Sequence, residues 1–223
     1  MDFVVSDGPN LVSQAPTRLH WAPRDGAEAV RRALADEGIA HLAASAELNL
    51  DEAQRSPWSF VERLLGVRPE LVERQTIRSL PDGRNFATGR MPAPFHTDSQ
   101  CFFGVPPHVQ LMLCVRAADE GGENRFVDGW HLAERLEQEE PALLERLFIR
   151  HRRIPFVFGD FFGPTISWRG ESLIVTHAPR ALPGDDLAPL VTAWLDRLPA
   201  FELRATAGEV LAIHNHRMLH GRR

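Results

Sequence analysis

The feature that most constrains the fold is the series of short, strand-like segments in the second half of the chain. These segments are rich in apolar and β-branched residues, are separated by Gly, Pro and polar turns, and cover residues 109–115, 125–128, 172–177, 201–206 and 208–215. Short strands at this density predict a sheet-based fold of the sandwich, barrel or jelly-roll kind. They disfavour a parallel sheet with crossover helices.

Helical segments accompany these strands without dominating them. Residues 27–38 have apolar positions at helical spacing and a closing Gly, and residues 56–66 have a Ser cap, Pro at the first helical position and a terminal Gly. Three further amphipathic segments follow at residues 130–140, 142–148 and 186–198. The sequence therefore predicts a mostly β protein with flanking helices.

Size and charge narrow the class of protein. At 223 residues and 43% hydrophobic composition, we expect a single domain spanning residues 1–223. The net charge of −5 and the lack of a basic cluster argue against a nucleic-acid partner. The acidic start and the lack of a long apolar run predict a cytoplasmic protein without a membrane partner. Cys101 and Cys114 have no second thiol nearby and are interpreted as reduced, and the oligomeric state is left open.

The segment PFHTDSQ carries the first candidate chemistry. His96 and Asp98 are separated by one residue. In an extended segment, residues two apart point to the same face, so the imidazole and the carboxylate converge. An H-x-D triplet is a weak motif in a chain with ten histidines, and a surface turn in which Asp98 accepts backbone hydrogen bonds is the alternative.

The end of the chain, HNHRMLHGRR, supplies His214, His216 and His220. Two imidazoles and one carboxylate on one face of a metal ion leave its other positions open, which is the arrangement of non-haem Fe(II) oxygenases. A hydrolytic zinc site would more often use three histidines, or two with a Glu. His214 and His216 also have a simpler interpretation as strand-end side chains bonded to backbone or solvent.

Four blocks in succession resemble a known family. NFATGRMPAPFHTD, PPHVQLMLCV, GGENRFVDGW and AGEVLAIHNHRMLHGRR are similar to blocks of the TauD/TfdA-like oxygenases, above all the γ-butyrobetaine and trimethyllysine hydroxylase branch. The resemblance covers Asn85 to Arg223. It implies a double-stranded β-helix (jelly roll, cupin-like), an iron site at His96, Asp98 and His220, and the use of Fe(II), 2-oxoglutarate and dioxygen.

The same resemblance suggests residues for the co-substrate. Asn85 matches an asparagine that lines the pocket, and Asn124 stands where many relatives have a Thr or Ser hydroxyl. In the family, an arginine beyond the last histidine binds the far carboxylate of 2-oxoglutarate as a bidentate pair. Because the sequence stops at Arg223, we expect a C-terminal segment to be missing, with Arg222, Arg223 or another Arg as the alternative partner. His177 falls near a substrate-facing position of the family.

The resemblance implies hydroxylation of an unactivated C–H bond in a small amino acid-like or secondary-metabolite substrate. A trimethylammonium group would favour an aromatic cage, and the sequence contains no Tyr, so only Phe or Trp side chains, such as Phe102, Phe103 or Phe162, could build one. Two alternatives stay open: a cupin-type metalloprotein with other chemistry, and a catalytically inactive relative that serves as a binding module.

Overall fold

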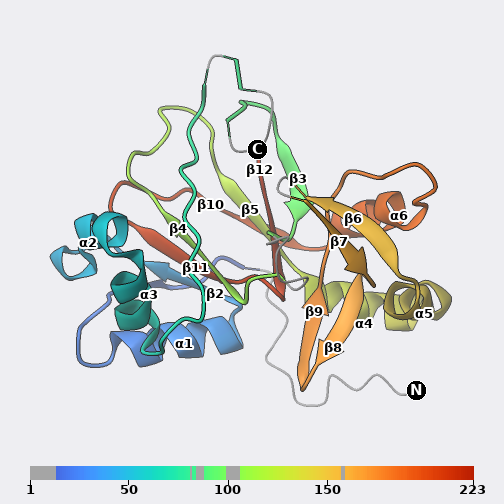
Figure 1. Cartoon of the computed structure of the whole chain (residues 1–223), viewed down its shortest axis with the longest axis horizontal. Helices are drawn as coiled ribbons and strands as arrows, with labels where there is room; N and C mark the ends of the chain where they lie inside the picture. The colour runs from blue at the N-terminus through green and yellow to red at the C-terminus, as the bar shows by residue number, and fades with distance from the viewer. Residues whose placement is uncertain (1–13, 81, 84–87, 99–105, 157–158) are drawn as a thin grey trace.

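Two four-stranded sheets form the centre of the structure, a computed structural model that describes residues 14–80, 82–83, 88–98, 106–156 and 159–223 (Figure 1). The first sheet has the strand order β1 (Arg18–Leu19), β2 (Ile39–Leu42), β11 (Val210–His214), β4 (Val109–Leu113). The second has the order β10 (Ala200–Leu203), β5 (Asn124–Asp128), β12 (Met218–Arg222), β3 (Ala93–His96). Within these sheets only β1 and β2 pair in parallel, connected by the helix α1 (Gly26–Asp36), and all other pairs are antiparallel. This confirms the expectation of a mostly β protein rather than a parallel sheet with crossover helices.

The two sheets pack against each other through a shared apolar cluster. Both sheets contribute its buried side chains, which are Ile39, Phe126, Phe201, Leu211, Ile213 and Met218. Alternation along each strand sends the intervening residues to the outer faces. On β11, for example, Leu211 and Ile213 face the other sheet, whereas Val210 and Ala212 face a second cluster on the outside.

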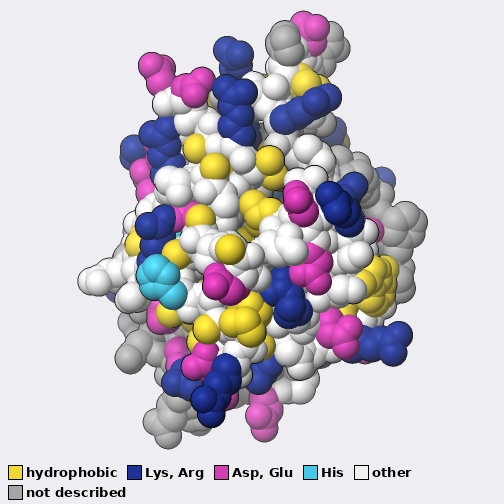
Figure 2. All heavy atoms as spheres, turned by 90° about the vertical axis from the view of Figure 1, so that its left-hand side faces the viewer, with side chains coloured by type: hydrophobic (Ala, Val, Ile, Leu, Met, Phe, Trp, Pro, Cys, Tyr) yellow, Lys and Arg dark blue, Asp and Glu magenta, His cyan; other side chains and the backbone are white. Residues whose placement is uncertain are grey.

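Helices cover both outer faces (Figure 1). The first sheet is covered by α1 (Gly26–Asp36), α2 (Leu50–Arg55) and α3 (Pro57–Leu65), with a 3₁₀ turn at Ala46–Leu48. The second is covered by α4 (Gly129–Glu139), α5 (Pro141–Ile149) and α6 (Leu187–Leu195). Arginine and acidic side chains are interspersed on the side of the molecule that Figure 2 shows. No helix in the described ranges is long and apolar enough to cross a membrane.

Two hairpins complete the described chain. They are formed by β6 (Arg152–Phe156) with β7 (Gly159–Gly163) and by β8 (Ile166–Arg169) with β9 (Ser172–Val175). The predicted helices 27–38 and 56–66 are confirmed as α1 and α3, and Gly66 caps α3 with a positive φ of 66°. The sequence did not predict β12, because residues 216–223 were interpreted only as a segment that carries a ligand.

A buried ion pair fastens the end of α1 to the second sheet. Arg217, fully buried, donates from Nε and Nη2 to Oδ2 of Asp128 at 3.1 and 2.8 Å. Its Nη1 donates to the carbonyls of Ala35 and Asp36 at the end of α1, and its guanidinium lies 4.5 Å from the Trp130 ring centroid. The pair therefore holds the turn before β12 in place.

Replacing Arg217 by Met should destabilise the protein by about 3–5 kcal/mol, because the buried Asp128 carboxylate loses its counter-charge. The free energy of unfolding in urea, followed by circular dichroism, measures the loss. Arg135→Met is the control, since Arg135 forms a partly exposed pair with Glu139 on α4 whose removal should cost less than about 1 kcal/mol. Equal losses in the two variants would contradict the role given to Arg217.

Candidate metal centre

The backbone at the end of β3 turns His96 and Asp98 to one side. Thr97, between them, points the other way: its hydroxyl donates to the carbonyl of Val175 at 2.9 Å, and its N–H donates to the carbonyl of His177 at 2.9 Å. Thr97 is fully buried by these contacts. The prediction that the imidazole and the carboxylate share a face is therefore confirmed.

Strand pairing brings the third side chain to the same place. His220 on β12 lies directly opposite His96 in the antiparallel pairing with β3. Gly221 follows at a point where β3 passes very close, since a Cβ there would lie 2.5 Å from the carbonyl oxygen of Ala93. The glycine of the HGR sequence therefore permits the close pairing that sets the two imidazoles side by side.

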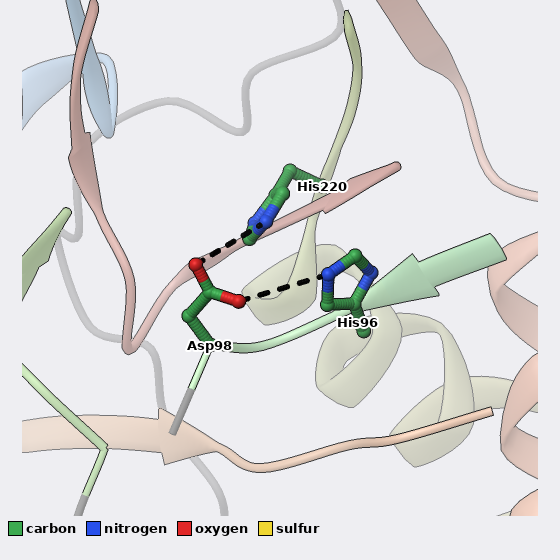
Figure 3. Close-up of side chains that lie close together, drawn as sticks. All are labelled: His96, Asp98 and His220. Carbon is green, nitrogen blue, oxygen red and sulfur yellow. Dashed lines mark ion pairs between the residues drawn. The ribbon is translucent and has the colours of Figure 1, made fainter. Parts of the chain in front are cut away.

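The three side chains converge on one point (Figure 3). Nε2 of His96 lies 3.7 Å from Oδ1 of Asp98, and Nε2 of His220 lies 3.8 Å from Oδ2. The two ring centroids are 4.4 Å apart, and one ligand atom from each residue falls within 4.8 Å of the others. No other group of three or more His, Cys, Asp or Glu side chains converges in this way within the described ranges.

The two imidazoles are prepared to donate a lone pair. Nδ1 of His96 lies 2.8 Å from the carbonyl oxygen of Pro94, and because a carbonyl can only accept, Nδ1 carries the proton. In the neutral tautomer that this contact selects, the lone pair lies on Nε2, the nitrogen nearer to Asp98. Burial, helped by His96 and opposed by Asp98, lowers the pKa of His220 to about 4, so this ring is neutral at physiological pH.

Two side chains that the sequence did not single out hold Asp98. The amide of Gln110 on β4 donates to Oδ2 of Asp98. The side chain of Asn215, just after β11, accepts from the backbone N–H of Asp98 at 3.1 Å and donates to its carbonyl at 2.7 Å. The signal for Gln110 was present, because it is the one polar residue in the apolar run VQLMLCV.

The residues expected to bind a co-substrate are placed in part. Asn124 and Arg222 are direct partners across β5 and β12, two residues from the level of His220. Alternation puts Arg222 on the same face of β12 as His220. The guanidinium of Arg222 donates to carbonyls of the 89–91 segment at 2.9 and 3.0 Å. Asn85 lies outside the described residues.

The other histidines of the C-terminal segment belong to a separate cluster. Nε2 of His214 lies 3.3 Å from Nε2 of His108, and the ring of His216 stacks on that of His108 with centroids 5.0 Å apart. Nε2 of His216 donates to the carbonyl of Pro106 at 2.7 Å. The simpler interpretation of His214 and His216, as structural side chains, agrees with these contacts.

His177, expected near a substrate-facing position, is fully buried. Its Nε2 lies 3.2 Å from the Thr192 hydroxyl. Burial, then the charges of Arg152 and His96, lower its pKa to about 3. Phe162, considered for an aromatic cage, is 70% exposed on β7, and its ring packs against that of His151.

Fold and site together define a class: a protein of two stacked, mainly antiparallel sheets with a His-Asp-His group carried by β12, the end of β3 and the segment that follows it. The chain belongs to the taurine catabolism dioxygenase TauD, TfdA family, whose model matches residues 16–179. The resemblance seen in the sequence blocks is thereby confirmed. The matched region includes His96 and Asp98 and ends before His220.

Curated relatives lie in the expected branch. The chain is 26% identical over 160 residues to the gamma-butyrobetaine dioxygenase of Homo sapiens, covering 62% of this chain and 41% of that protein. It is 26% identical over 200 residues to the mitochondrial trimethyllysine dioxygenase of Bos taurus, covering 78% and 47%. The chain thus spans less than half the length of these two relatives.

Solved structures share the fold. A taurine dioxygenase from Burkholderia xenovorans superposes with a TM-score of 0.62 at 15% identity, covering 96% of this chain and 82% of that one. An asparagine oxygenase, solved with Fe(II), 2S,3S-3-hydroxyasparagine and succinate, superposes with a TM-score of 0.53 at 18% identity, covering 65% and 48%. At these identities the likeness concerns the fold alone.

Acid should destabilise the protein through His214. Burial, then the neighbouring His108 and His216, lower its folded-state pKa to about 3, whereas an unfolded histidine titrates near about 6.5. Between these two pKa values, His214 is protonated in the unfolded chain and neutral in the folded chain, so acid favours unfolding. The contribution of His214 to the free energy of unfolding is fully present above about pH 6.5. It is lost as the pH falls toward about 3, at up to about 1.4 kcal/mol per pH unit.

The check is urea unfolding of the wild type and His214→Gln at several pH values between 7 and 5. The variant should show the shallower loss of unfolding free energy with acid. An identical pH dependence in the two proteins would contradict the burial-based account.

Proposed function

We propose that this chain is an Fe(II)- and 2-oxoglutarate-dependent dioxygenase domain whose metal is held by His96, Asp98 and His220. The observation that carries the proposal is the convergence of these three side chains from two paired strands and the segment after β3. Membership in the TauD, TfdA family supports the same assignment.

The donor set suits a ferrous ion. Two imidazoles and one carboxylate would bind one face of the ion and leave room for further ligands, as in non-haem Fe(II) oxygenases. The lowered pKa of His220 keeps its lone pair available, and the Nδ1 contact of His96 directs its lone pair to Nε2.

The fold we propose is the double-stranded β-helix, or jelly roll. Two four-stranded sheets packed face to face, with the candidate site on β3 and β12, support this description. The sheets exclude water from one side of the site, since the cluster around Phe126 and Met218 fills the space between them. Protein geometry and water exclusion are the contributions expected of a protein that houses a reactive cofactor.

The chemistry divides between the bound groups and the chain. Iron with 2-oxoglutarate and dioxygen would supply the oxidation, in which 2-oxoglutarate becomes succinate and CO2 while a substrate C–H bond is hydroxylated. The chain fixes the ligand geometry through His96, Asp98 and His220. We assign Asn124, Arg222 and Asn85 to the co-substrate site; the position of the first two beside His220 supports this.

The proposed substrate is a small, amino acid-like molecule. The similar proteins named above act, by their names, on butyrobetaine, trimethyllysine, taurine or asparagine. The lack of Tyr in the chain disfavours a trimethylammonium substrate. Of the side chains considered for an aromatic cage, Phe162 lies 70% exposed on a hairpin, and Phe102 and Phe103 lie outside the described residues. Free amino acids and small sulfonates are therefore the first compounds to assay.

Anaerobic addition of Fe(II) and then 2-oxoglutarate should produce the weak visible charge-transfer absorption of an iron–2-oxoglutarate chelate. His96→Ala, Asp98→Ala and His220→Ala should each abolish it, because each removes one of three ligands. His108→Ala is the matched control: it removes a histidine that lies 3.3 Å from another imidazole but outside the candidate centre, and the absorption should persist.

Admitting oxygen should then convert 2-oxoglutarate to succinate, measured by chromatography. Metal binding without succinate would support a cupin-type protein with other chemistry. Failure of the wild-type chain to bind either iron or 2-oxoglutarate would support the inactive binding module and overturn the proposal.

A further inference from the structure

Asp98 is the one candidate ligand that no strand holds. His96 and His220 are fixed by their direct pairing across β3 and β12. Asp98 comes after the end of β3, and its side chain is 46% exposed. The position of its carboxylate must therefore depend on contacts other than the sheet.

The first such contact is a pair of hydrogen bonds between the side chain of Asn215 and the backbone of Asp98. Asn215 accepts from its N–H at 3.1 Å and donates to its carbonyl at 2.7 Å, so both backbone polar groups are held by one side chain. The same amide nitrogen also donates to the carbonyl of Pro107 at 2.9 Å. Asn215 is 1% exposed and belongs to the first sheet's side of the molecule, just after β11.

The second contact fixes the carboxylate itself. Gln110 on β4 donates to Oδ2 of Asp98, which leaves Oδ1 as the oxygen nearer to His96. A carboxylate with one oxygen occupied by a hydrogen bond is biased toward binding a metal through the other oxygen alone. One-oxygen binding keeps the protein ligands at three and preserves the open positions that a co-substrate and dioxygen need.

Gln110 is difficult to explain as a packing residue. Its neighbours Val109 and Leu111 pack on the helix-covered side of β4. Gln110 is on the opposite face together with Met112, which packs against the apolar cluster between the two sheets. Its Oε1 is buried and accepts no hydrogen bond from the described residues. An unsatisfied buried oxygen lowers stability, so an apolar residue would serve packing better at this position.

We propose that Gln110 and Asn215 are positioning residues that hold Asp98 in ligand geometry, Asn215 through the backbone and Gln110 by reserving Oδ2. The proposal rests on the proposed function, since it assumes a metal at His96, Asp98 and His220. Neither residue contacts the metal, and both act through Asp98. Gln110 is on β4 and Asn215 directly follows β11, both in the first sheet, whereas the imidazoles come from the second, so the centre joins the two sheets.

The test compares Gln110→Met with Leu111→Met, two substitutions to the same residue on neighbouring positions of β4. Affinity for Co(II), used as a visible probe in place of Fe(II), is measured by titration without 2-oxoglutarate. Loss of the hydrogen bond to Asp98 should weaken binding about 10- to 100-fold in Gln110→Met. Leu111→Met should bind as the wild type does, because Leu111 packs toward the helices.

Melting temperature of the metal-free protein separates positioning from packing. Gln110→Met should melt at or above the wild-type temperature, because it removes an unsatisfied buried oxygen while binding weakens. Asn215→Ala should weaken Co(II) binding and also lower the melting temperature, since it removes three hydrogen bonds. A fall in affinity without a fall in stability is a result that a structural role does not give.

The Co(II) titrations distinguish failure of the positioning role from failure of the proposed function. If the wild type binds Co(II) and Gln110→Met binds equally tightly, the positioning role is overturned and the proposed function stands. If the wild type itself binds no Co(II), the proposed function fails and the positioning role fails with it.

Discussion

The antiparallel pairing of β12 with β3 is the interaction on which the rest of the site depends. It sets His220 opposite His96, although the two are far apart in sequence. Gly221 allows the close approach, and the buried Arg217–Asp128 pair fastens the turn from which β12 starts. A local change in any of these features would move one imidazole relative to the other, so the chemistry of the centre is tied to the stability of this part of the fold.

The first sheet contributes to the centre in a different way. It supplies no candidate ligand, but Gln110 and Asn215 reach Asp98 from β4 and from the end of β11. The sheets are joined by the apolar cluster between them and, at the edge of that cluster, by these polar contacts. Such an arrangement explains how a residue beyond the end of β3 can still have a fixed position.

Much of the strand pattern and the pairing of His96 with Asp98 could be predicted from local sequence patterns, whereas His220 was selected among three C-terminal histidines only by the family resemblance. The spacing of His96 and Asp98 is a local property of extended backbone, and segments such as VQLMLCV carry an evident strand signal. The strand β12 was not predicted in this way, because His220, Gly221 and Arg222 interrupt the apolar and β-branched pattern that marks a strand. The contacts of Gln110 and Asn215 with Asp98 could not be predicted, because they join segments that are distant in sequence. The expectation of a single domain with a missing C-terminal segment stays a prediction.

The most direct test of the central claim is anomalous diffraction from crystals of the protein grown with Mn(II) in place of Fe(II). We expect one strong anomalous peak at bonding distance from Nε2 of His96, a carboxylate oxygen of Asp98 and Nε2 of His220. A peak at the His108–His214 pair instead, where two Nε2 atoms are 3.3 Å apart, would contradict the account.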